Sequence, residues 1–306
     1  MKVLVSGLVN IETTLKIPCF PLDYSPVLYP FNGVGLTVSG VGFNLALALQ
    51  TLGHDVEFLT FLGNDTPGAV AMSEIAKLGV ATDRILRNLP ATPQSVILYD
   101  DDGRRQIHVD LKDVQDRRYP AGLFRSAVDH ADAVVVCNVN FNRELLPAAA
   151  RLDIPVFTDV HVLSDPRDEY NRDFMAAADV LFLSDEGLWS PPDEAARQLA
   201  DLYDCRIVVI GLGAEGALLC ERGQPSVWVP AAHPRPVVST IGAGDALMAS
   251  FAHGMLAGLK PAEALRRAVM FAGWKIGEAG AACGFLDAQS LDTLCRGQQA
   301  PDRGRA

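Results

Sequence analysis

From residue 121 onward, short apolar stretches rich in β-branched residues alternate with stretches of helical periodicity. The apolar stretches are 133–137, 155–158, 180–183 and 207–210, and the helical ones are 123–130, 143–152 and 193–203. Strands separated by helices pair in parallel, because each helix carries the chain back across one face of the sheet. The pattern therefore predicts an α/β fold with a mainly parallel sheet between helical layers. A functional site is expected at the carboxyl ends of the strands.

Length, charge and cysteine usage narrow the class of protein. The chain has 306 residues, a formal net charge of −11 and six cysteines without a Cys-x-x-Cys pair. The acidic charge disfavours general nucleic-acid binding, and no apolar run approaches the ~20 residues of a membrane-spanning helix. Residues 2–9 are expected to form a buried strand and carry no signal-peptide pattern, and the scattered cysteines favour reduced thiols. We therefore expect a cytoplasmic protein that binds neither nucleic acid nor membrane.

Two further regions predict a smaller sheet. Residues 13–39 contain four prolines and short apolar runs, which favour short strands over a helix. Residues 95–99 and 104–109 flank Asp100-Asp101-Asp102-Gly103. An Asp-Gly pair between two such stretches predicts a β-hairpin.

Two closely spaced glycines precede a strongly apolar helical stretch in Gly242-Ala243-Gly244-Asp245. A sharp turn at a helix start leaves backbone N–H groups unpaired and places them at the positive end of the helix dipole, which suits an anion. Asp245 falls in the first turn of this helix. Its carboxylate is either a simple helix cap or a general base that faces a hydroxyl group beside the anion site.

Two motifs of this chain resemble signatures of the ribokinase-like (PfkB) carbohydrate kinase family. Ser239-Thr240-Ile241-Gly242-Ala243-Gly244-Asp245 is similar to the family's Asp-Thr-x-Gly-Ala-Gly-Asp signature. Residues 39–49, Ser-Gly-Val-Gly-Phe-Asn-Leu-Ala-Leu-Ala-Leu, resemble its glycine-pair region, which leads to Asn and an alanine-rich helix. The two motifs stand in the family's order, and the resemblance covers residues 2–286.

The resemblance implies a ribokinase-like three-layer α/β/α core with a small β-sheet lid over the substrate. The core would comprise residues 1–12, 40–90 and 116–297, and the lid residues 13–39 and 91–115. Residues 298–306 would form a flexible tail.

For the acceptor substrate, the resemblance implies a set of residues near the first strand and the first motif. An Asp of the family that binds substrate hydroxyls corresponds most nearly to Glu12, with Asn10 two residues earlier. From the motif at residues 39–49, the resemblance implies that Gly40, Gly42 and Asn44 bind the acceptor. From the residues alone, Glu12 could equally be a solvated side chain at a strand end, and Asn44 only a helix cap.

A glycine-rich loop at 211–216 has the spacing of a dinucleotide fingerprint, Gly-x-Gly-x-x-Gly. That fingerprint must open a helix, whereas a strand-like stretch and a turn follow here, so we reject an NAD or flavin site. The family has Thr-x-Gly-x-x-Gly at this point. The resemblance therefore assigns Gly213, Gly216 and Thr240 of the main signature to nucleotide binding, although Gly211 replaces the family's threonine.

The metal site departs from the family's Asn-x-x-Glu pattern. Ser184 stands for the Asn and Gly187 for the Glu, which leaves Asp185 and Glu186 as the nearby carboxylates for Mg²⁺. An acidic solvated loop is an equally good interpretation of this segment. Ser239 replaces a family Asp near a monovalent-cation loop, which leaves K⁺ activation open.

Together the motifs predict an ATP- and Mg²⁺-dependent kinase that phosphorylates a hydroxymethyl group of a sugar or sugar-like molecule. Asp245 would be the general base, and Gly242, Ala243 and Gly244 would build the anion hole. A nucleoside kinase and a non-catalytic sugar-binding protein of the same fold stay open as alternatives. A homodimer through the lid is a further possibility, since lid sheets of this family often pair.

Overall fold

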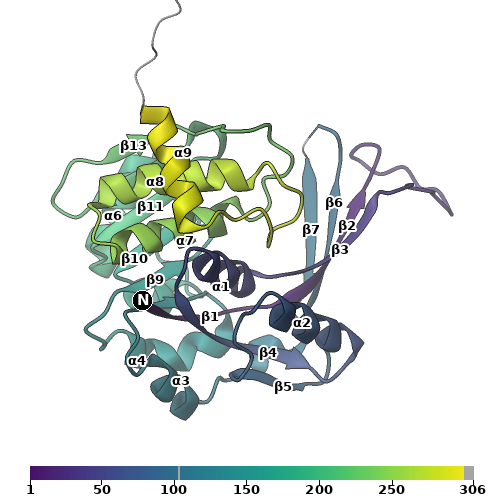
Figure 1. Ribbon diagram of the computed structural model, residues 1–306, viewed down its shortest axis with the longest axis horizontal. Coiled ribbons are helices and arrows are strands. Elements are labelled where there is room, and N and C mark those ends of the chain that lie inside the picture. Colours follow the sequence, from purple (N-terminus) through teal and green to yellow (C-terminus); the bar gives the residue numbers. More distant parts are fainter. Residues whose placement is uncertain (103, 300–306) are drawn as a thin grey trace, which may run out of the picture.

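The computed structural model describes residues 1–102 and 104–299. A large twisted sheet forms the centre of the protein (Figure 1). Its strand order is β13-β12-β11-β10-β9-β8-β1-β4-β5. The strands are β1 Lys2–Ser6, β4 Asp55–Gly63, β5 Ile85–Leu89, β8 Ala133–Val136, β9 Val156–Asp159, β10 Val180–Ser184, β11 Ile207–Gly211, β12 Ala217–Glu221 and β13 Val227–Val229. All neighbours pair in parallel except β11–β12 and β12–β13.

Helices cover both faces of this sheet. One layer contains α1 Val41–Thr51, α2 Thr66–Lys77, α7 Ala243–Leu256, α8 Pro261–Lys275 and α9 Ala288–Gln299, and the other α3 Ala121–Val128, α4 Leu146–Ala149, α5 Arg172–Ala176 and α6 Pro192–Tyr203. Successive residues of a strand point to opposite faces, so Val3 and Val5 pack in one layer and Leu4 in the other. The three-layer α/β/α prediction is confirmed.

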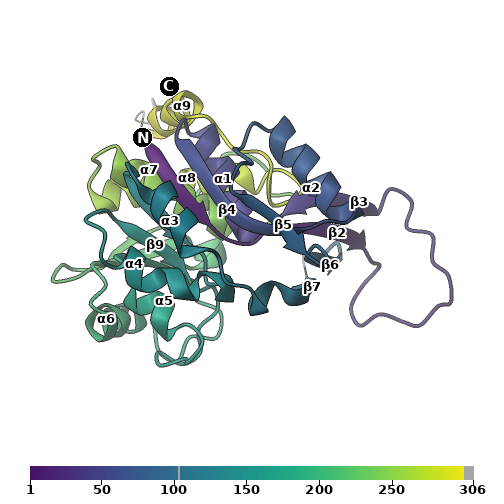
Figure 2. The same cartoon turned by 90° about the horizontal axis from the view of Figure 1, so that it is seen from below.

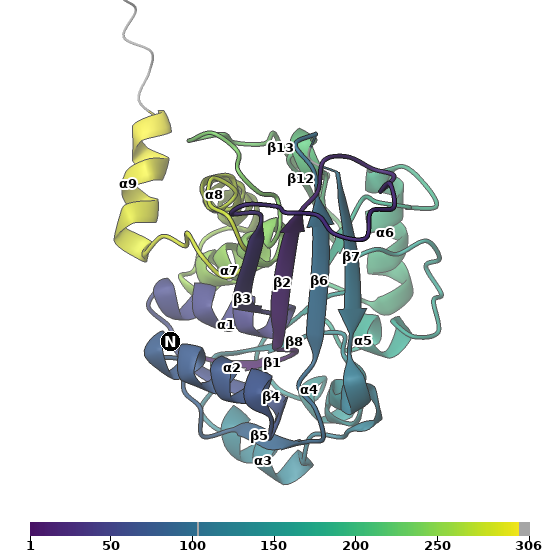
Figure 3. The same ribbon diagram turned by 90° about the vertical axis from the view of Figure 1, so that its right-hand side faces the viewer.

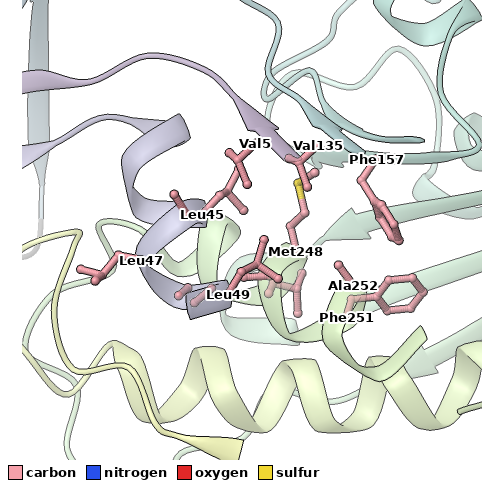
Figure 4. Close-up of a cluster of buried hydrophobic side chains, with 14 of the residues drawn as sticks. Val5, Leu45, Leu47, Leu49, Val135, Phe157, Met248, Phe251 and Ala252 are labelled. Carbon is pink, nitrogen blue, oxygen red and sulfur yellow. The ribbon is translucent and has the colours of Figure 1, made fainter. Parts of the chain in front are cut away.

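Helices α1 and α7 pack against each other and against the sheet, because both are apolar on nearly every side. Figure 4 shows side chains from these two helices meeting side chains from the strands. The labelled ones are Val5, Leu45, Leu47, Leu49, Val135, Phe157, Met248, Phe251 and Ala252. This packing fixes the amino-terminal ends of the two helices relative to each other.

A second, four-stranded sheet, which we call the lid, stands beside the core (Figure 1). Its order is β3-β2-β6-β7, seen face on in Figure 3. The strands are β2 Asn10–Lys16, β3 Val34–Ser39, β6 Gln94–Tyr99 and β7 Arg105–Asp110. The predicted hairpin of residues 95–109 is the antiparallel pair β6–β7. In Figure 2, the connection from β2 to β3 projects away from the rest of the molecule.

Two local predictions differ from the structure. The strand expected over 2–9 ends at Ser6, and the chain then enters β2, so Asn10 and Glu12 lie on a lid strand. The helix expected over 143–152 is a 3₁₀ segment, Asn140–Leu145, followed by the single turn α4. Pro147 explains this, because proline lacks the N–H that a continuing helix needs and clashes with the preceding turn.

Helix α9 ends the described part of the chain. Of the tail predicted at 298–306, Gln298 and Gln299 belong to α9, and residues 300–306 lie outside the described residues. Within the described part of the chain, none of the helices has the length and apolar character needed to cross a bilayer.

Candidate active site

Asn44 and Asp245 meet at the amino-terminal ends of α1 and α7, although 201 positions separate them in the sequence. Asn44 Nδ2 donates a hydrogen bond of 2.7 Å to Asp245 Oδ2. Both side chains are buried, and Asp245 is only 8% exposed. The structure therefore brings together one predicted substrate residue and the predicted base.

Glycines make this close approach possible. A Cβ on Gly42 would lie 2.4 Å from the backbone carbon of Gly7, so only glycine lets α1 start against the end of β1. Gly40 has a φ of +106° and lies against the backbone of Leu8. Gly242 caps α7 with a φ of +76°, and a Cβ there would meet the carbonyl oxygen of Ala281 at 2.8 Å.

The anion site predicted at the start of α7 would bind through backbone N–H groups. The N–H of Ala243 is already used, since it donates to the carbonyl oxygen of Thr240 at 3.2 Å. Gly244 and Asp245 lie in the first helical turn, where N–H groups have no intrahelical acceptor. These donors at the positive end of the helix can bind an anion.

Burial raises the pKa of Asp245 to about 6. The hydrogen bond from Asn44, and the charges of His161 and Lys275, act in the opposite direction, whereas the neighbouring carboxylate of Asp159 adds to the increase. A carboxyl group with such a pKa is ionised at neutral pH and still basic enough to take a proton from an alcohol during reaction.

Polar side chains of the lid face this pair. Burial raises the pKa of Glu12, and the neighbouring Asp245 carboxylate raises this pKa further. The Ser39 hydroxyl and the Lys275 ammonium act in the opposite direction and lower it. Asn10 Nδ2 donates to Ser95 Oγ at 2.9 Å. Three of the buried side-chain oxygens that have no hydrogen-bond partner in the described residues lie on residues predicted to bind the acceptor: Asn10 Oδ1, Glu12 Oε1 and Asn44 Oδ1. Unpaired buried acceptors are costly, and a ligand with hydroxyl donors would pair with them.

The lid also touches the loop before α7. Arg105 Nη1, on β7, donates to Thr240 Oγ1 at 2.7 Å. Ser239 Oγ, at the position of the family Asp, accepts from the N–H of Ile241 at 3.3 Å. Thr240 thus connects the lid to the predicted anion site.

Asp159 and His161, which the sequence patterns did not single out, lie at the same site. Asp159 is the last residue of β9 and is buried, and its Oδ2 lies 4.0 Å from the position of a Cβ on Gly244. Its Oδ1 accepts from the N–H of His161 at 2.8 Å. A charged residue at the carboxyl end of a buried strand is the signal that could have identified Asp159.

Lys275 is a third residue that the sequence patterns missed. It lies on α8, is fully buried, and its ammonium donates to the backbone carbonyls of Ile241 and Gly280. Helical spacing already places it on the buried face, since it follows Phe271 by four residues. A lysine on the apolar face of a helix is therefore the signal that was available.

The glycine-rich loop at 211–216 is a hairpin connection between β11 and β12. A strand therefore follows the loop, whereas a dinucleotide fingerprint would open a helix. The loop does not have the structure of a dinucleotide site. Gly213 has a φ of +54° and open space at its Cβ position, whereas a Cβ on Gly216 would lie 2.0 Å from the carbonyl oxygen of Val229. The loop leaves β11 next to Ser184, which pairs with Gly211 in the sheet.

The acidic residues after β10 are exposed. The N–H of Asp185 donates to the carbonyl oxygen of Gly211 at 3.0 Å, and the N–H of Glu186 to Ser184 Oγ at 3.2 Å. Neither carboxylate is buried. Among residues 1–102 and 104–299, no cluster of three or more potential metal ligands is found.

Comparison with known proteins decides the family. A profile described as pfkB family carbohydrate kinase matches residues 2–287. The chain belongs to this family.

Curated relatives agree with this assignment of the pfkB-family chain. It is 31% identical over 276 residues to acarbose 7(IV)-phosphotransferase of Actinoplanes sp., with 89% of this chain and 90% of that protein covered. It is 28% identical over 258 residues to ATP-dependent ribose-1-phosphate kinase of Halopiger xanaduensis, with 82% and 83% covered. The pfkB-family chain is accordingly a phosphotransferase with an alcohol group as acceptor.

Solved structures show the same fold. A microbiome-derived acarbose kinase superimposes with a TM-score of 0.86 at 23% identity, covering 96% of this chain and 98% of that one. Arabidopsis thaliana ribokinase, complexed with ribose and ATP, gives a TM-score of 0.80 at 21% identity, covering 95% and 97%. The ribokinase-like fold class predicted for this pfkB-family kinase is confirmed.

Proposed function

We propose that this protein is an ATP-dependent kinase that phosphorylates a hydroxymethyl group of a sugar or sugar-containing molecule, with Asp245 as general base. The observation that carries this proposal is the buried Asp245 carboxylate, held by Asn44 at the first turn of α7 beside unpaired backbone donors. This arrangement puts a proton acceptor and an anion site next to each other.

In the reaction, the acceptor hydroxyl oxygen bonds to the γ-phosphorus of ATP while the bond from that phosphorus to the β,γ-bridging oxygen breaks. The hydroxyl proton passes to the Asp245 carboxylate, and ADP leaves. The N–H groups of Gly244 and Asp245 hold the transferring phosphoryl oxygens, and Gly242 provides the turn that aims them. Positioning and preorganised charge supply most of the acceleration in such transfers.

Nucleotide and Mg²⁺ fit the residues around the anion site. We assign Gly213, Gly216, Ser184 and Thr240 to the nucleotide, because the open space at Gly213 lets phosphate approach the backbone. The Asp159 carboxylate lies beside Gly244, and oxygen ligands suit Mg²⁺, which keeps several of its waters. When bound, Mg²⁺ neutralises phosphate charge. Asp185 and Glu186 would act from the exposed loop through water.

Replacing Asp159 with asparagine is expected to raise the Mg²⁺ concentration needed for half-maximal activity by about 10-fold, the lower end of ligand-sphere effects. The reason is that a buried carboxylate beside Gly244 loses its charge. Titrating Mg²⁺ at fixed ATP measures this. Asp185→Asn is the matched comparison, because Asp185 is exposed, and a larger effect there than at Asp159 would reverse the assignment.

For the acceptor, we propose that Asn10, Glu12 and Asn44 bind its hydroxyl groups, with Gly40 and Gly42 allowing close approach of the backbone. The three unpaired buried oxygens support this role, since sugar hydroxyls can donate to them. Relatives named for acarbose and ribose 1-phosphate also point to a sugar-like acceptor. The lid residues would set which sugar fits.

An acceptor panel with detection of ADP release tests the function. It should include acarbose, ribose, ribose 1-phosphate, a ketodeoxy-sugar, fructose and the nucleosides adenosine and pseudouridine. Acceptor-dependent ADP release with the sugars supports the proposal, and preference for a nucleoside identifies a nucleoside kinase instead. Ligand-dependent thermal stabilisation without ADP release from any acceptor would indicate a non-catalytic binding protein.

The pH dependence of kcat/KM should report Asp245. Because its pKa is raised to about 6, protonation below that pH removes the base, and kcat/KM should fall as the pH decreases through about 6. Asn44→Ser removes the hydrogen bond that lowers this pKa, so the midpoint should move to higher pH. A midpoint that stays unchanged in Asn44→Ser would contradict the role of Asn44.

Location and assembly complete the proposal. We propose a cytoplasmic enzyme, and the six cysteines support this because none forms a disulfide. We also propose that the lid is the surface of a homodimer. Val34, Leu36 and Val96 are exposed and lie on one face of the lid, as their register positions show.

A further inference from the structure

Lys275 carries a buried positive charge that the proposed reaction does not use directly. Its side chain is fully buried, and its Nζ donates to the backbone carbonyl oxygen of Gly280 at 2.7 Å and to that of Ile241. Within the described residues, no carboxylate lies within ion-pair distance of Nζ. Two carbonyl oxygens are therefore its direct partners.

Such an ammonium is costly to bury. Removing a charge from water costs several kcal/mol unless polar partners replace the water, and here only neutral carbonyls touch it. Burial lowers the pKa of Lys275, while the charges of Cys283, Asp245 and Glu12 raise it and that of Arg235 lowers it. A methionine of similar length would fill the same space without this cost, which indicates that the charge serves the site.

The two carbonyls belong to the segments that shape the start of α7. Ile241 directly precedes Gly242, the residue with positive φ that caps the helix. Gly280 directly precedes Ala281, whose backbone packs against Gly242. The Lys275 ammonium thus ties the loop before the anion site to the loop after α8.

We propose that Lys275 is a positioning residue whose ammonium does the work of a bound monovalent cation, so that this kinase does not depend on K⁺. A K⁺ ion held by the carbonyls of Ile241 and Gly280 would need the place that Nζ already occupies. The residues therefore do not fit a potassium site at this loop. This inference rests on the proposed kinase function and concerns how its anion site is held.

The first experiment uses the unaltered protein. Activity and the thermal unfolding midpoint are measured in sodium, potassium and tetramethylammonium salts at equal ionic strength. We expect less than about a 2-fold change in kcat and no potassium-specific increase in the unfolding midpoint. The reason is that the Lys275 side chain already supplies the positive charge that a bound cation would bring. A potassium-specific rise in either quantity would overturn the inference.

The second experiment removes the ammonium. Lys275→Met in tetramethylammonium buffer should lose about 10²-fold in kcat, the scale of a small misplacement of reacting groups, with a much smaller change in acceptor KM. Lys275→Ala leaves space for an ion, so ammonium or potassium salts should restore part of its kcat and raise its unfolding midpoint. Lys77→Met, an exposed lysine on α2, is the control and should resemble the unaltered protein.

The outcomes separate this inference from the proposed function. If Lys275→Met keeps full kcat, or if small cations change neither the kcat nor the midpoint of Lys275→Ala, Lys275 is not a built-in cation. If Lys275→Met does not fold, the cation dependence of the unaltered protein and the midpoints of Lys275→Ala still decide. If no acceptor is phosphorylated by the unaltered protein, the proposed function fails, and the unfolding midpoints alone test Lys275.

Discussion

Replacing Asp245 with asparagine will lower kcat by at least ~10²-fold, the usual scale of general-base effects, while the protein folds as before. Asparagine has nearly the same shape, and its side-chain oxygen can still accept the hydrogen bond from Asn44. It cannot take up the hydroxyl proton, so only the catalytic step loses a contribution. Steady-state ADP release and the thermal unfolding midpoint measure the two quantities separately.

The control for this variant is another carboxylate changed in the same way. Asp173 pairs with Arg143 outside the proposed site, so Asp173→Asn should leave kcat unchanged. Nucleotide binding by Asp245→Asn, measured by calorimetry, should stay near that of the unaltered protein. Turnover of Asp245→Asn close to that of Asp173→Asn would refute the assignment of the base.

Periodicity sufficed for the architecture because strong patterns dominated the local choices. The β-branched runs from 133 to 210 form the predicted parallel strands, and residues 94–99 and 105–110 pair as the predicted hairpin. The prediction of one strand over 2–9 was wrong because the chain passes from the core to the lid at Gly7, where the backbone of Gly42 leaves no room for a Cβ. Such a contact between distant segments has no local signal.

In the candidate site, too, residues within local motifs could be predicted, whereas contacts between distant segments could not. Asn44 and Asp245 could be proposed from the sequence because each lies in a glycine-containing motif that makes a helix start recognisable. The unpaired oxygens of Asn10 and Glu12 add a reason to keep these residues at the acceptor side. Asp159 escaped notice because it is a single residue outside any motif, and its closeness to Gly244 exists only in the folded chain.

Lys275 was missed for a different reason. Phe271, four residues earlier on α8, is a fully packed core residue that stacks on Phe285. The lysine was visible on the same helical face, but its partners are backbone carbonyls. Backbone acceptors carry no side-chain signature, so no motif could announce them.

Replacing Gly42 with alanine should cause a large loss of stability. The new Cβ would lie 2.4 to 2.8 Å from three backbone atoms of Gly7, and backbone cannot move aside as a flexible side chain can. We expect the free energy of unfolding to fall by about 3 kcal/mol, the upper end of overpacking effects, as measured by urea denaturation. Asn44 follows two residues later, so kcat should fall as well.

Gly122→Ala is the matched control, because Gly122 also lies in the first turn of a helix but has no atom within 4 Å of its Cβ position. Alanine there should leave the free energy of unfolding unchanged or raise it by up to about 1 kcal/mol, since alanine favours helix over glycine. Cys137→Ala should not rescue Gly42→Ala, because the obstructing atoms belong to the Gly7 backbone and not to the Cys137 side chain. Equal stability of Gly42→Ala and Gly122→Ala would mean that α1 can withdraw from β1, and Asn44 would then not be held against Asp245 by that contact.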